Sequence, residues 1–591
     1  MRFLALLASC CLLIASTFLA LVFGTATYAA LEHCGRIPYF EYLPNGQVYL
    51  PLALSPARFA TFQTTIWGLF TGSLLTTGLQ LCAKRSRQQL SGLLAETRSA
   101  FNTLAATVRR LTAAERLVAG GLLAVIAGVQ LFWLLTDSLS PDELVSFDAF
   151  VHEGPRTIAS FYPIPNNHIF YNLASWVLAQ LYGGNVRAIM RLPSFVAAVL
   201  GTAGSYVLLA HWCNFRIGTA VTALFSLSQL TIIYAASGRG YYLQMGCLQL
   251  AFFSVLAVLN GGHYQRLAWA VLVVSSVVGL YTIPTFALPL FALAMVLVAM
   301  VPSLQPSERG RFLKHAGLAL GTIGVVTAVL YLPVGCVSGW PRLLTNRYVT
   351  SHSSGGFWAI LPAYVYETTA MLLGPVRPAL MLCVPGVAAV PFLLRRGSMG
   401  PQHATLAWAS WTLVVTPLGL MLMGQILIPA RVLLYVTYFL FLLAALTTDQ
   451  AFTKWQSQPS RWIALAPAGL LVALLGHRIV GLAQQIPVLH QSQEQERAGN
   501  QAYQWLLAHP LGPVFMGASY YGLLFHHYAL LDKQELFLHA RHVPGVAYKY
   551  LVWAHGQPTT QPKWAEKLPY RVKYRDALTC IYALDTASSP H

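Results

Sequence analysis

The 591-residue chain carries Asp, Glu, Lys or Arg at only 9% of its positions, and 56% of its residues are hydrophobic. Soluble domains carry about 25% charged residues, so the composition excludes an ordinary soluble enzyme. The formal net charge of +18 comes from Lys and Arg that collect in short loops between apolar runs. This is the positive-inside pattern of membrane proteins, and no basic stretch is interleaved with stacking aromatics. We expect a multi-pass protein of the plasma (inner) membrane with no nucleic-acid partner.

Apolar runs of roughly 20 residues recur along most of the chain, and each can cross the bilayer as a helix. Lys and Arg mark the loops on one side, which puts the N-terminus inside and the C-terminus outside. Residues 358–373 suit the membrane interface instead, because Trp and Tyr favour that level. The expected spans number about thirteen, at 3–30, 59–82, 118–136, 192–211, 217–236, 241–259, 267–281, 285–301, 316–333, 379–394, 406–423, 432–446 and 462–482.

The first part of the chain divides into two predicted units. Residues 1–83 form an N-terminal two-helix transmembrane unit, whose first run is a signal anchor or a cleaved signal peptide. Residues 84–117 are polar and basic with periodic leucines. This pattern predicts a cytoplasmic amphipathic linker helix along the membrane surface.

The remainder divides into a transmembrane domain at 118–482 and a polar tail at 483–591. The stretch 137–191 is too polar to cross the membrane and should form a long outside loop with short surface helices. The tail has mixed polarity and a short strand-like run at 512–516, so we expect a small extracytoplasmic α+β domain of about 110 residues. Three cysteines fall in or beside outside segments, and a disulfide among them stays open, at Cys34, Cys336 and Cys580.

Carboxylates are scarce outside the tail, yet five of them gather in one predicted outside loop, at Asp137, Asp142, Glu143, Asp148 and Glu153. An acidic loop can be simply a solvated one. Three arginines, however, recur near predicted outer helix ends, at Arg191, Arg239 and Arg431. Each arginine can snorkel to the interface. Because the positive-inside rule disfavours outside arginine, these three are also candidate anion sites.

A carboxylate and several arginines at the outer membrane face suit transfer of a sugar from a lipid phosphate. The leaving phosphate is already a stable anion, so it needs cationic stabilisation rather than a general acid. The acceptor hydroxyl or amine must lose a proton, for which one carboxylate can act as base. A glycosidase would instead need a pair of carboxyl groups.

Several motifs in order along the chain strengthen this interpretation. Asp142-Glu143 opens the loop, Pro165-Asn-Asn-His-Ile-Phe-Tyr-Asn172 follows, Arg191-Leu-Pro-Ser194 begins a helix, and Ser237-Gly-Arg-Gly-Tyr-Tyr-Leu243 and Pro429-Ala-Arg-Val-Leu-Leu-Tyr435 come later. Their order, spacing and common predicted side resemble the GT-C glycosyltransferases, in particular bacterial relatives of protein O-mannosyltransferases and of the aminoarabinose transferase that modifies lipid A.

The resemblance implies an all-α polytopic bundle of the GT-C type, a polyprenyl-phosphate sugar donor and inversion at the anomeric carbon. It implies Asp142 as catalytic base and Glu143 as its support or as a metal ligand. The donor phosphate would be bound by Arg239, Arg431 and Arg191. Candidates for the acceptor or sugar pocket are Asp148, Asn167, His168, Tyr171 and Tyr241. A divalent metal stays open, with Glu143, His168 and His152 as candidate ligands.

The expected partners are the polyprenyl-phosphate sugar, membrane lipids and an extracytoplasmic acceptor that is a protein, a lipid or a glycan. A lipid or polysaccharide transporter is the first alternative. Transporters often show internal repeats and ionisable residues at mid-membrane, whereas this chain shows no repeat and gathers its ionisable residues in a loop. A non-catalytic lipid-binding relative is the second alternative, against which the presence of both Asp142 and Arg239 argues.

Overall fold

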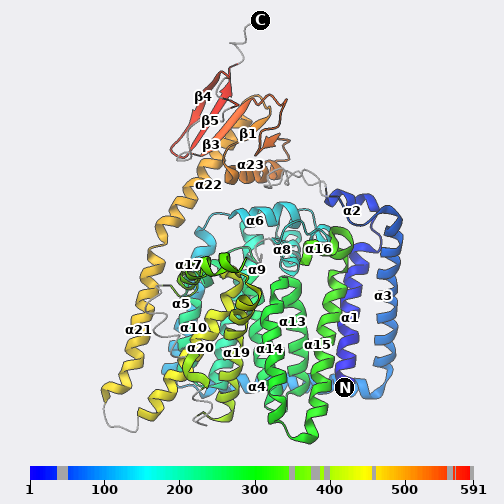
Figure 1. Ribbon diagram of the computed structural model, residues 1–591, viewed down its shortest axis with the longest axis vertical. Coiled ribbons are helices and arrows are strands. Elements are labelled where there is room, and N and C mark those ends of the chain that lie inside the picture. Colours follow the sequence, from blue (N-terminus) through cyan, green and yellow to red (C-terminus); the bar gives the residue numbers. More distant parts are fainter. Residues whose placement is uncertain are drawn as a thin grey trace.

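The structure, a computed structural model, describes residues 1–35, 51–344, 353–374, 387–391, 399–455, 461–554, 564–565 and 568–585. Within these residues, ten helices are long and apolar enough to cross a membrane, or twelve if two sharply bent helix pairs each count as one span. The chain is therefore an integral multi-pass membrane protein, as the composition predicts. Figure 1 shows these helices side by side, with a small sheet above one end of the bundle.

Twelve of the thirteen predicted spans coincide with helices, and the remaining one, at 379–394, lies mostly outside the described residues. The matching helices are α1 (Arg2–Phe23), α3 (Pro56–Cys82), α5 (Ala113–Thr136), α9 (Val186–Trp212), α10 (Phe215–Ser226) with α11 (Gln229–Ala236), α12 (Tyr241–Leu259), α13 (Gln265–Thr282), α14 (Ala287–Ala299), α15 (Pro306–Val334), α19 (Pro401–Gly424), α20 (Leu434–Trp455) and α21 (Arg461–Ala483). The predicted interfacial segment is α17 (Ser354–Leu373).

The first helix is shorter than its apolar run predicts, because α1 ends at Phe23 and a separate helix, α2 (Tyr28–Cys34), follows. A side chain from the next span accounts for this end. The Gln63 amide donates to the carbonyls of Phe23, Gly24 and Ala26 at 2.9 to 3.3 Å. Carbonyls at a helix end need such partners, and here a neighbouring helix supplies them.

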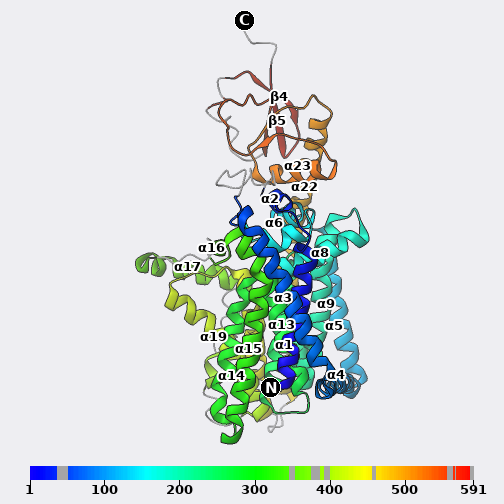
Figure 2. The same cartoon turned by 90° about the vertical axis from the view of Figure 1, so that its right-hand side faces the viewer.

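Helix α4 (Lys84–Arg110) bends by 88° from α3 and has no buried residue. It lies across the end of the bundle where the N-terminus is found (Figures 1 and 2). The amphipathic surface helix expected from the periodic leucines is therefore present. The four-part division of the chain stays a prediction.

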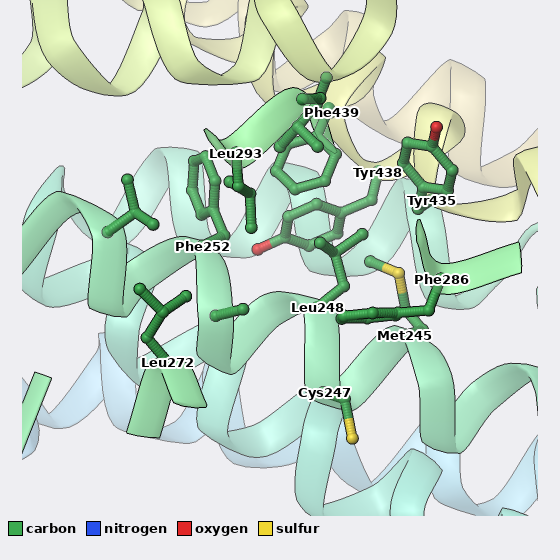
Figure 3. Close-up of a cluster of buried hydrophobic side chains, with 14 of the residues drawn as sticks. Met245, Cys247, Leu248, Phe252, Leu272, Phe286, Leu293, Tyr435, Tyr438 and Phe439 are labelled. Atoms are coloured by element: carbon green, nitrogen blue, oxygen red, sulfur yellow. The ribbon is translucent and has the colours of Figure 1, made fainter. Parts of the chain in front are cut away.

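The bundle core gathers around α12, whose side chains meet those of α13, α14 and α20 (Figure 3). Phe252 of α12 packs against Phe439 of α20 with ring centroids 4.8 Å apart. Because lipid tails are as apolar as these side chains, close packing and interhelical hydrogen bonds hold such helices together. Two buried hydroxyl pairs contribute, Ser205 with Tyr438 at 2.6 Å and Thr202 with Tyr242 at 2.8 Å.

The polar stretch after α5 folds into short helices at the end of the bundle away from the N-terminus (Figure 1). These elements are α6 (Pro141–Ser146), a π-helical turn η2 (Phe147–Val151), α7 (Pro155–Ser160) and α8 (Ile169–Tyr182). The loop with short surface helices expected from the sequence is present.

The tail forms the expected α+β unit. Two helices, α22 (Ile486–Leu507) and α23 (Ser519–Leu531), accompany strands β1 (Val514–Met516), β2 (Leu538–His539), β3 (Tyr550–Ala554), β4 (Tyr570–Arg575) and β5 (Thr579–Leu584). The sheet order is β2-β1-β3-β5-β4, with β1 parallel to its two neighbours and the other pairs antiparallel. Leu524 and Phe525 of α23 share a buried cluster with Leu144 and Phe147, so this unit sits directly on the polar loop.

The cysteines near outside segments do not pair in the described structure. All eight described cysteines are free thiols, including Cys34, Cys336 and Cys580. Cys34 lies buried with its Sγ 3.2 Å from the Thr157 hydroxyl, and Cys580 is buried in β5. No disulfide therefore joins these three.

Candidate active site

The Asp142-Glu143 pair of the loop opens α6 through a capping box. The Ser140 hydroxyl accepts from the Glu143 N–H at 3.3 Å, and the Glu143 carboxylate accepts from the Ser140 N–H at 2.9 Å. Pro141 occupies the first helical position, where its missing N–H costs nothing. The two carboxylates then diverge, because consecutive helical residues face different directions. Asp142 keeps 55% of its side chain exposed, whereas Glu143 keeps 1%.

Glu143 forms a fully satisfied buried ion pair with Arg191 of α9. Arg191 Nε and Nη2 donate to the two carboxylate oxygens at 2.8 and 2.9 Å. Its remaining hydrogen bonds go to the carbonyls of Leu134, Asp137 and Ser138 at 2.6 to 3.0 Å. Burial would raise the pKa of Glu143, but the charge and hydrogen bonds of Arg191 outweigh it and lower that pKa.

This geometry does not fit the roles expected for these two residues. Every donor direction of the Arg191 guanidinium already has an acceptor, so it has none left for a donor phosphate. Glu143 Oε1 also accepts from the Gly238 N–H at 2.5 Å. A carboxylate surrounded by N–H donors cannot readily serve as base or metal ligand. We therefore assign both residues to holding α5, α6, α9 and the Gly238 turn together.

Asp142 pairs with a different arginine, whose donors are only partly used. Arg239 Nη1 lies 2.9 Å from Asp142 Oδ2, and it also donates to the Asn166 carbonyl oxygen. Asn166 in turn donates to the Asp142 backbone carbonyl at 3.1 Å. Arg239 is only 4% exposed, and its Nε has no hydrogen-bond acceptor within the described residues. A buried guanidinium N–H without an acceptor is costly, and it indicates a missing ligand.

Two glycines present Arg239 in a tight turn between α11 and α12. A Cβ at Gly238 would lie 2.8 Å from Met190 Cβ and 3.0 Å from Glu143 Oε1. A Cβ at Gly240 would lie 2.6 Å from Thr282 Cγ2. The Ser194 hydroxyl donates to the Arg239 carbonyl at 2.8 Å and fixes the turn further. The Gly-Arg-Gly sequence is thus explained by close approach of neighbouring chains.

His168 lies beside Arg239 as a neutral donor. Its Nδ1 accepts from the Gly240 N–H at 2.9 Å, so the proton of the neutral ring is on Nε2. That Nε2 is 3.5 Å from Arg239 Nη2, so the ring lies directly beside the guanidinium. Burial, followed by the charges of Arg239 and Arg431, holds the pKa of His168 well below its usual 6.5.

Aromatic rings and a second arginine border this cluster. Tyr241 lies with its ring centroid 5.7 Å from the Arg239 guanidinium carbon, and its ring packs edge-on against His168 at 5.0 Å. Arg431, in the 3₁₀ turn η6 (Ala430–Leu433), and Tyr241 line one small pocket. Its other walls come from α12, η3 (Pro284–Phe286), α14 and α20, and Figure 3 shows several of them: Met245, Leu248, Phe286 and Tyr435.

Two predicted pocket residues, Asn167 and Tyr171, have structural roles instead. The Asn167 amide donates to the carbonyls of Ile158 and Phe161 at 2.8 and 2.9 Å. The Tyr171 hydroxyl is buried, donates to the Met190 carbonyl and lies 3.1 Å from the Ser194 hydroxyl oxygen. These side chains are bound to backbone carbonyls of neighbouring segments, so their polar groups are not available to a substrate.

Asp148 is also not a pocket residue, because its side chain is fully buried against the C-terminal unit. Its Oδ1 lies 2.7 Å from His527 Nδ1, and its Oδ2 lies 3.6 Å from His526 Nδ1. Burial would raise the pKa of Asp148, but the two histidines of α23 outweigh it and lower that pKa. Asp148 therefore joins the loop to α23.

The residues do not fit a metal ion. No group of three or more His, Cys, Asp or Glu side chains in the described part of the chain could hold one. Both Glu143 oxygens accept from N–H donors, and His168 Nδ1 accepts from a backbone N–H. Neither Glu143 nor His168 has a lone pair directed at a shared site, so we derive no step through a metal.

Of the predicted site residues, the structure brings together Asp142, Arg239, His168, Tyr241 and Arg431. The sequence analysis did not predict a role for Asn166 or for the two histidines of α23. Asn166 and Asn167 are adjacent and chemically identical, and only their contacts distinguish them. His526 and His527 lie in the tail, far from Asp148 in sequence. Their adjacency and their place on an otherwise apolar helix, α23, were the available signal.

No protein-family model matches the chain, and no curated protein matches it. Two solved structures of ArnT from Cupriavidus metallidurans are similar in fold. The structure bound to undecaprenyl phosphate is 14% identical, with a TM-score of 0.51, over 80% of this chain and 98% of that chain. The apo structure is 16% identical over the same shares, with a TM-score of 0.39. The first of these shows that this chain shares the fold of ArnT, which agrees with the polytopic helical bundle expected from the sequence.

Proposed function

We propose that this chain is a membrane glycosyltransferase that moves a sugar from a polyprenyl-phosphate donor to an extracytoplasmic acceptor. The observation that carries the proposal is the unfilled donor edge of Arg239. Its Nε has no acceptor in the described residues, and its Nη2 lies 3.5 Å from His168 Nε2. Nε and Nη2 form the edge with which an arginine binds phosphate through two parallel hydrogen bonds.

His168 completes a three-donor anion site. Its Nε2 lies 3.5 Å from Arg239 Nη2, beside that edge, and its neutral state leaves it a donor without adding a second buried charge. Arg239 Nη1 lies 2.9 Å from Asp142 Oδ2, so the same guanidinium would contact both the donor phosphate and the carboxylate of the proposed base. Preorganised donors of this kind stabilise the negative charge that develops on a leaving phosphate.

The apolar part of the donor has a complementary surface nearby. The pocket between Tyr241 and Arg431 has walls of Met245, Leu248 and Phe286. The pocket has a volume of about 10 Å³, so we propose that the polyprenyl chain lies along the apolar residues at its edge rather than inside it. ArnT, whose fold this chain shares, binds undecaprenyl phosphate in its crystal structure.

In the proposed reaction, an acceptor hydroxyl or amine attacks the anomeric carbon on the face opposite the phosphate. Asp142 takes the acceptor proton as the new bond forms. The bond from the anomeric carbon to the phosphate oxygen breaks, and its electron pair leaves on the phosphate, which Arg239 and His168 stabilise. Attack opposite the leaving group gives inversion. Because about half of the Asp142 side chain is exposed to solvent, an acceptor can approach its carboxylate.

The site should face away from the cytoplasm. The helix α6 and the C-terminal sheet lie at one end of the bundle, and α4 with its many arginines lies at the other (Figure 1). Asp142 is part of α6, and Arg239 pairs with it. By the positive-inside rule the basic end is cytoplasmic. This supports an extracytoplasmic position for both the site and the C-terminal unit.

The test is transfer by purified variants from a panel of synthetic undecaprenyl-phosphate sugars, with isolated cell-envelope material as the acceptor source. Asp142→Asn keeps the shape but cannot accept a proton at neutral pH. Turnover should fall by about 10²–10⁴, with donor binding and the melting temperature little changed. Glu153→Gln, a carboxylate change in the same loop, should behave as wild type.

The outcomes separate the alternatives. A folded Asp142→Asn protein with near wild-type turnover would exclude Asp142 as base. Binding of undecaprenyl phosphate without turnover of any donor would identify a non-catalytic lipid-binding protein. Failure to bind undecaprenyl phosphate at all would contradict the proposed donor.

A further inference from the structure

A second cavity lies at the opposite end of the bundle from Asp142. It has a volume of about 650 Å³ and opens between the start of α1, the helix α4, the turn from α12 to α13 and the start of α15. Figures 1 and 2 show these segments together near the N-terminus. The volume lies within the range of roughly 300–1,000 Å³ typical of ligand sites, and the proposed glycosyl transfer makes no use of this cavity.

The cavity wall carries an excess of positive charge. Arg2, Arg266 and Arg311 line it, and Glu308 is the acidic side chain among its described lining residues. Arg266 is already paired with Glu96 at 3.0 Å. The guanidinium groups of Arg2 and Arg311 have no ion pair or hydrogen bond to any described residue. Two unpaired arginines from different helices, at the mouth of one cavity, suit a phosphate.

The same cavity has an apolar wall. Leu259, Leu304 and Phe312 line it, and each of these side chains is only partly buried. A free phosphate or a small phosphorylated solute would leave this wall without a partner. A ligand with a charged head and an apolar body covers both kinds of surface.

The cavity also lies where such a ligand is present. Helix α4 runs across this end of the bundle and exposes large apolar side chains, with Leu94 at 71% and Phe101 at 73%. An amphipathic helix of this kind lies in the headgroup region of the bilayer. A basic pocket between membrane helices at that level is suited to an anionic lipid headgroup.

We propose that this cavity binds the headgroup of an anionic phospholipid, with its phosphate between Arg2 and Arg311 and its glycerol and upper chains against Leu259, Leu304 and Phe312. Because Arg2 belongs to α1 and Arg311 to α15, the lipid joins the first helix to the bundle. The consequence is a lipid-dependent stability that is independent of the chemistry at Asp142.

The experiment measures the melting temperature of the full chain in a neutral detergent. Phosphatidylglycerol should raise it by several degrees, whereas phosphatidylcholine and soluble glycerol 3-phosphate should not. The double variant Arg2→Gln with Arg311→Gln should lose this response. Lys314→Gln removes a positive charge from the same helix, outside the cavity lining, and should keep the response.

An equal response to phosphatidylcholine would overturn the requirement for a negative charge. A response to glycerol 3-phosphate would show that a free phosphorylated solute is the ligand instead. If the double variant does not fold, native mass spectrometry of the wild-type protein decides. Preferential retention of phosphatidylglycerol over phosphatidylcholine during delipidation supports the proposal, and equal retention of the two lipids contradicts it.

Discussion

Two neighbouring carboxylates of one helix each pair with a buried arginine, and the two pairs differ in how completely they are satisfied. In the Glu143–Arg191 pair, both side chains are at most 1% exposed and the arginine has five hydrogen bonds. In the Asp142–Arg239 pair, the carboxylate is half exposed and the arginine Nε has no acceptor in the described residues. Their net charges are the same, so charge does not distinguish them.

The difference shows how a structural ion pair is recognised beside a functional one. Burying a guanidinium costs desolvation free energy, and this cost is offset only when all of its N–H donors have acceptors. Arg191 meets that condition within the chain, so it stabilises the loop. Arg239 does not, and the unfilled edge is where a ligand oxygen would be bound. Gly238 links the two, since its N–H donates to Glu143 and the next residue is Arg239.

The largest effect should come from breaking the satisfied pair. Arg191→Met leaves Glu143 as an unpaired buried charge and leaves three carbonyls without their donor. Removing one partner of a buried pair typically costs about 3–5 kcal/mol, so the variant should melt far below wild type or fail to fold. The measurement is thermal melting of the purified protein in detergent.

The control for this change is Arg187→Met. Arg187 belongs to the same helix, α9, but it is partly exposed. It pairs with Glu496 of α22 at 3.0 Å. An ion pair of this kind contributes about 0–1 kcal/mol, so the melting temperature should change little. If Arg191→Met melted no lower than Arg187→Met, the structural assignment of Arg191 would be wrong.

A smaller effect, on binding rather than folding, should follow from Arg239→Lys. Lysine keeps the charge but cannot offer two parallel hydrogen bonds from one edge. Losing one charge-assisted hydrogen bond costs about 1.5–3 kcal/mol, which is a loss of roughly 10- to 150-fold in affinity for undecaprenyl phosphate. Arg187→Lys is the matched control and should bind normally. Wild-type affinity in both Arg239→Lys and Arg239→Ala would exclude the proposed phosphate site.

Local patterns in the sequence were enough to predict the spans, the surface helix α4, the loop helices and the α+β tail. Run length and the placement of Lys and Arg are properties of single segments, so they can be read without the fold. The end of α1 could not be predicted this way. It depends on Gln63 of helix α3, whose amide donates hydrogen bonds to the carbonyls of Phe23, Gly24 and Ala26.

The site could be predicted as a set of residues but not as a set of roles. Arg191 and Arg239 occur in similar positions near helix ends, and only the carbonyls around Arg191 distinguish it. Asp148 follows Asp142 in the same loop, but its partners His526 and His527 come from α23. Such roles are set by contacts between residues far apart in the chain, which spacing and composition do not encode.

The smallest expected effect concerns His168 and tests whether the donor beside Arg239 is neutral. Burial and two nearby arginines hold its folded-state pKa well below 6.5, whereas an unfolded histidine titrates near 6.5. Below about pH 6.5 the unfolded chain therefore binds a proton that the folded chain does not. The wild-type protein should lose stability relative to His168→Gln as pH falls, by up to about 1.4 kcal/mol per pH unit. The Gln amide keeps one acceptor and one donor but does not titrate, so the difference between the two proteins removes the contributions of the other histidines. Undecaprenyl phosphate affinity should show no titration by this residue from pH 6 to 8. An affinity that rises on acidification in the wild type, but not in His168→Gln, would mean that His168 is cationic when it binds, and that the donor site holds two buried positive charges rather than one.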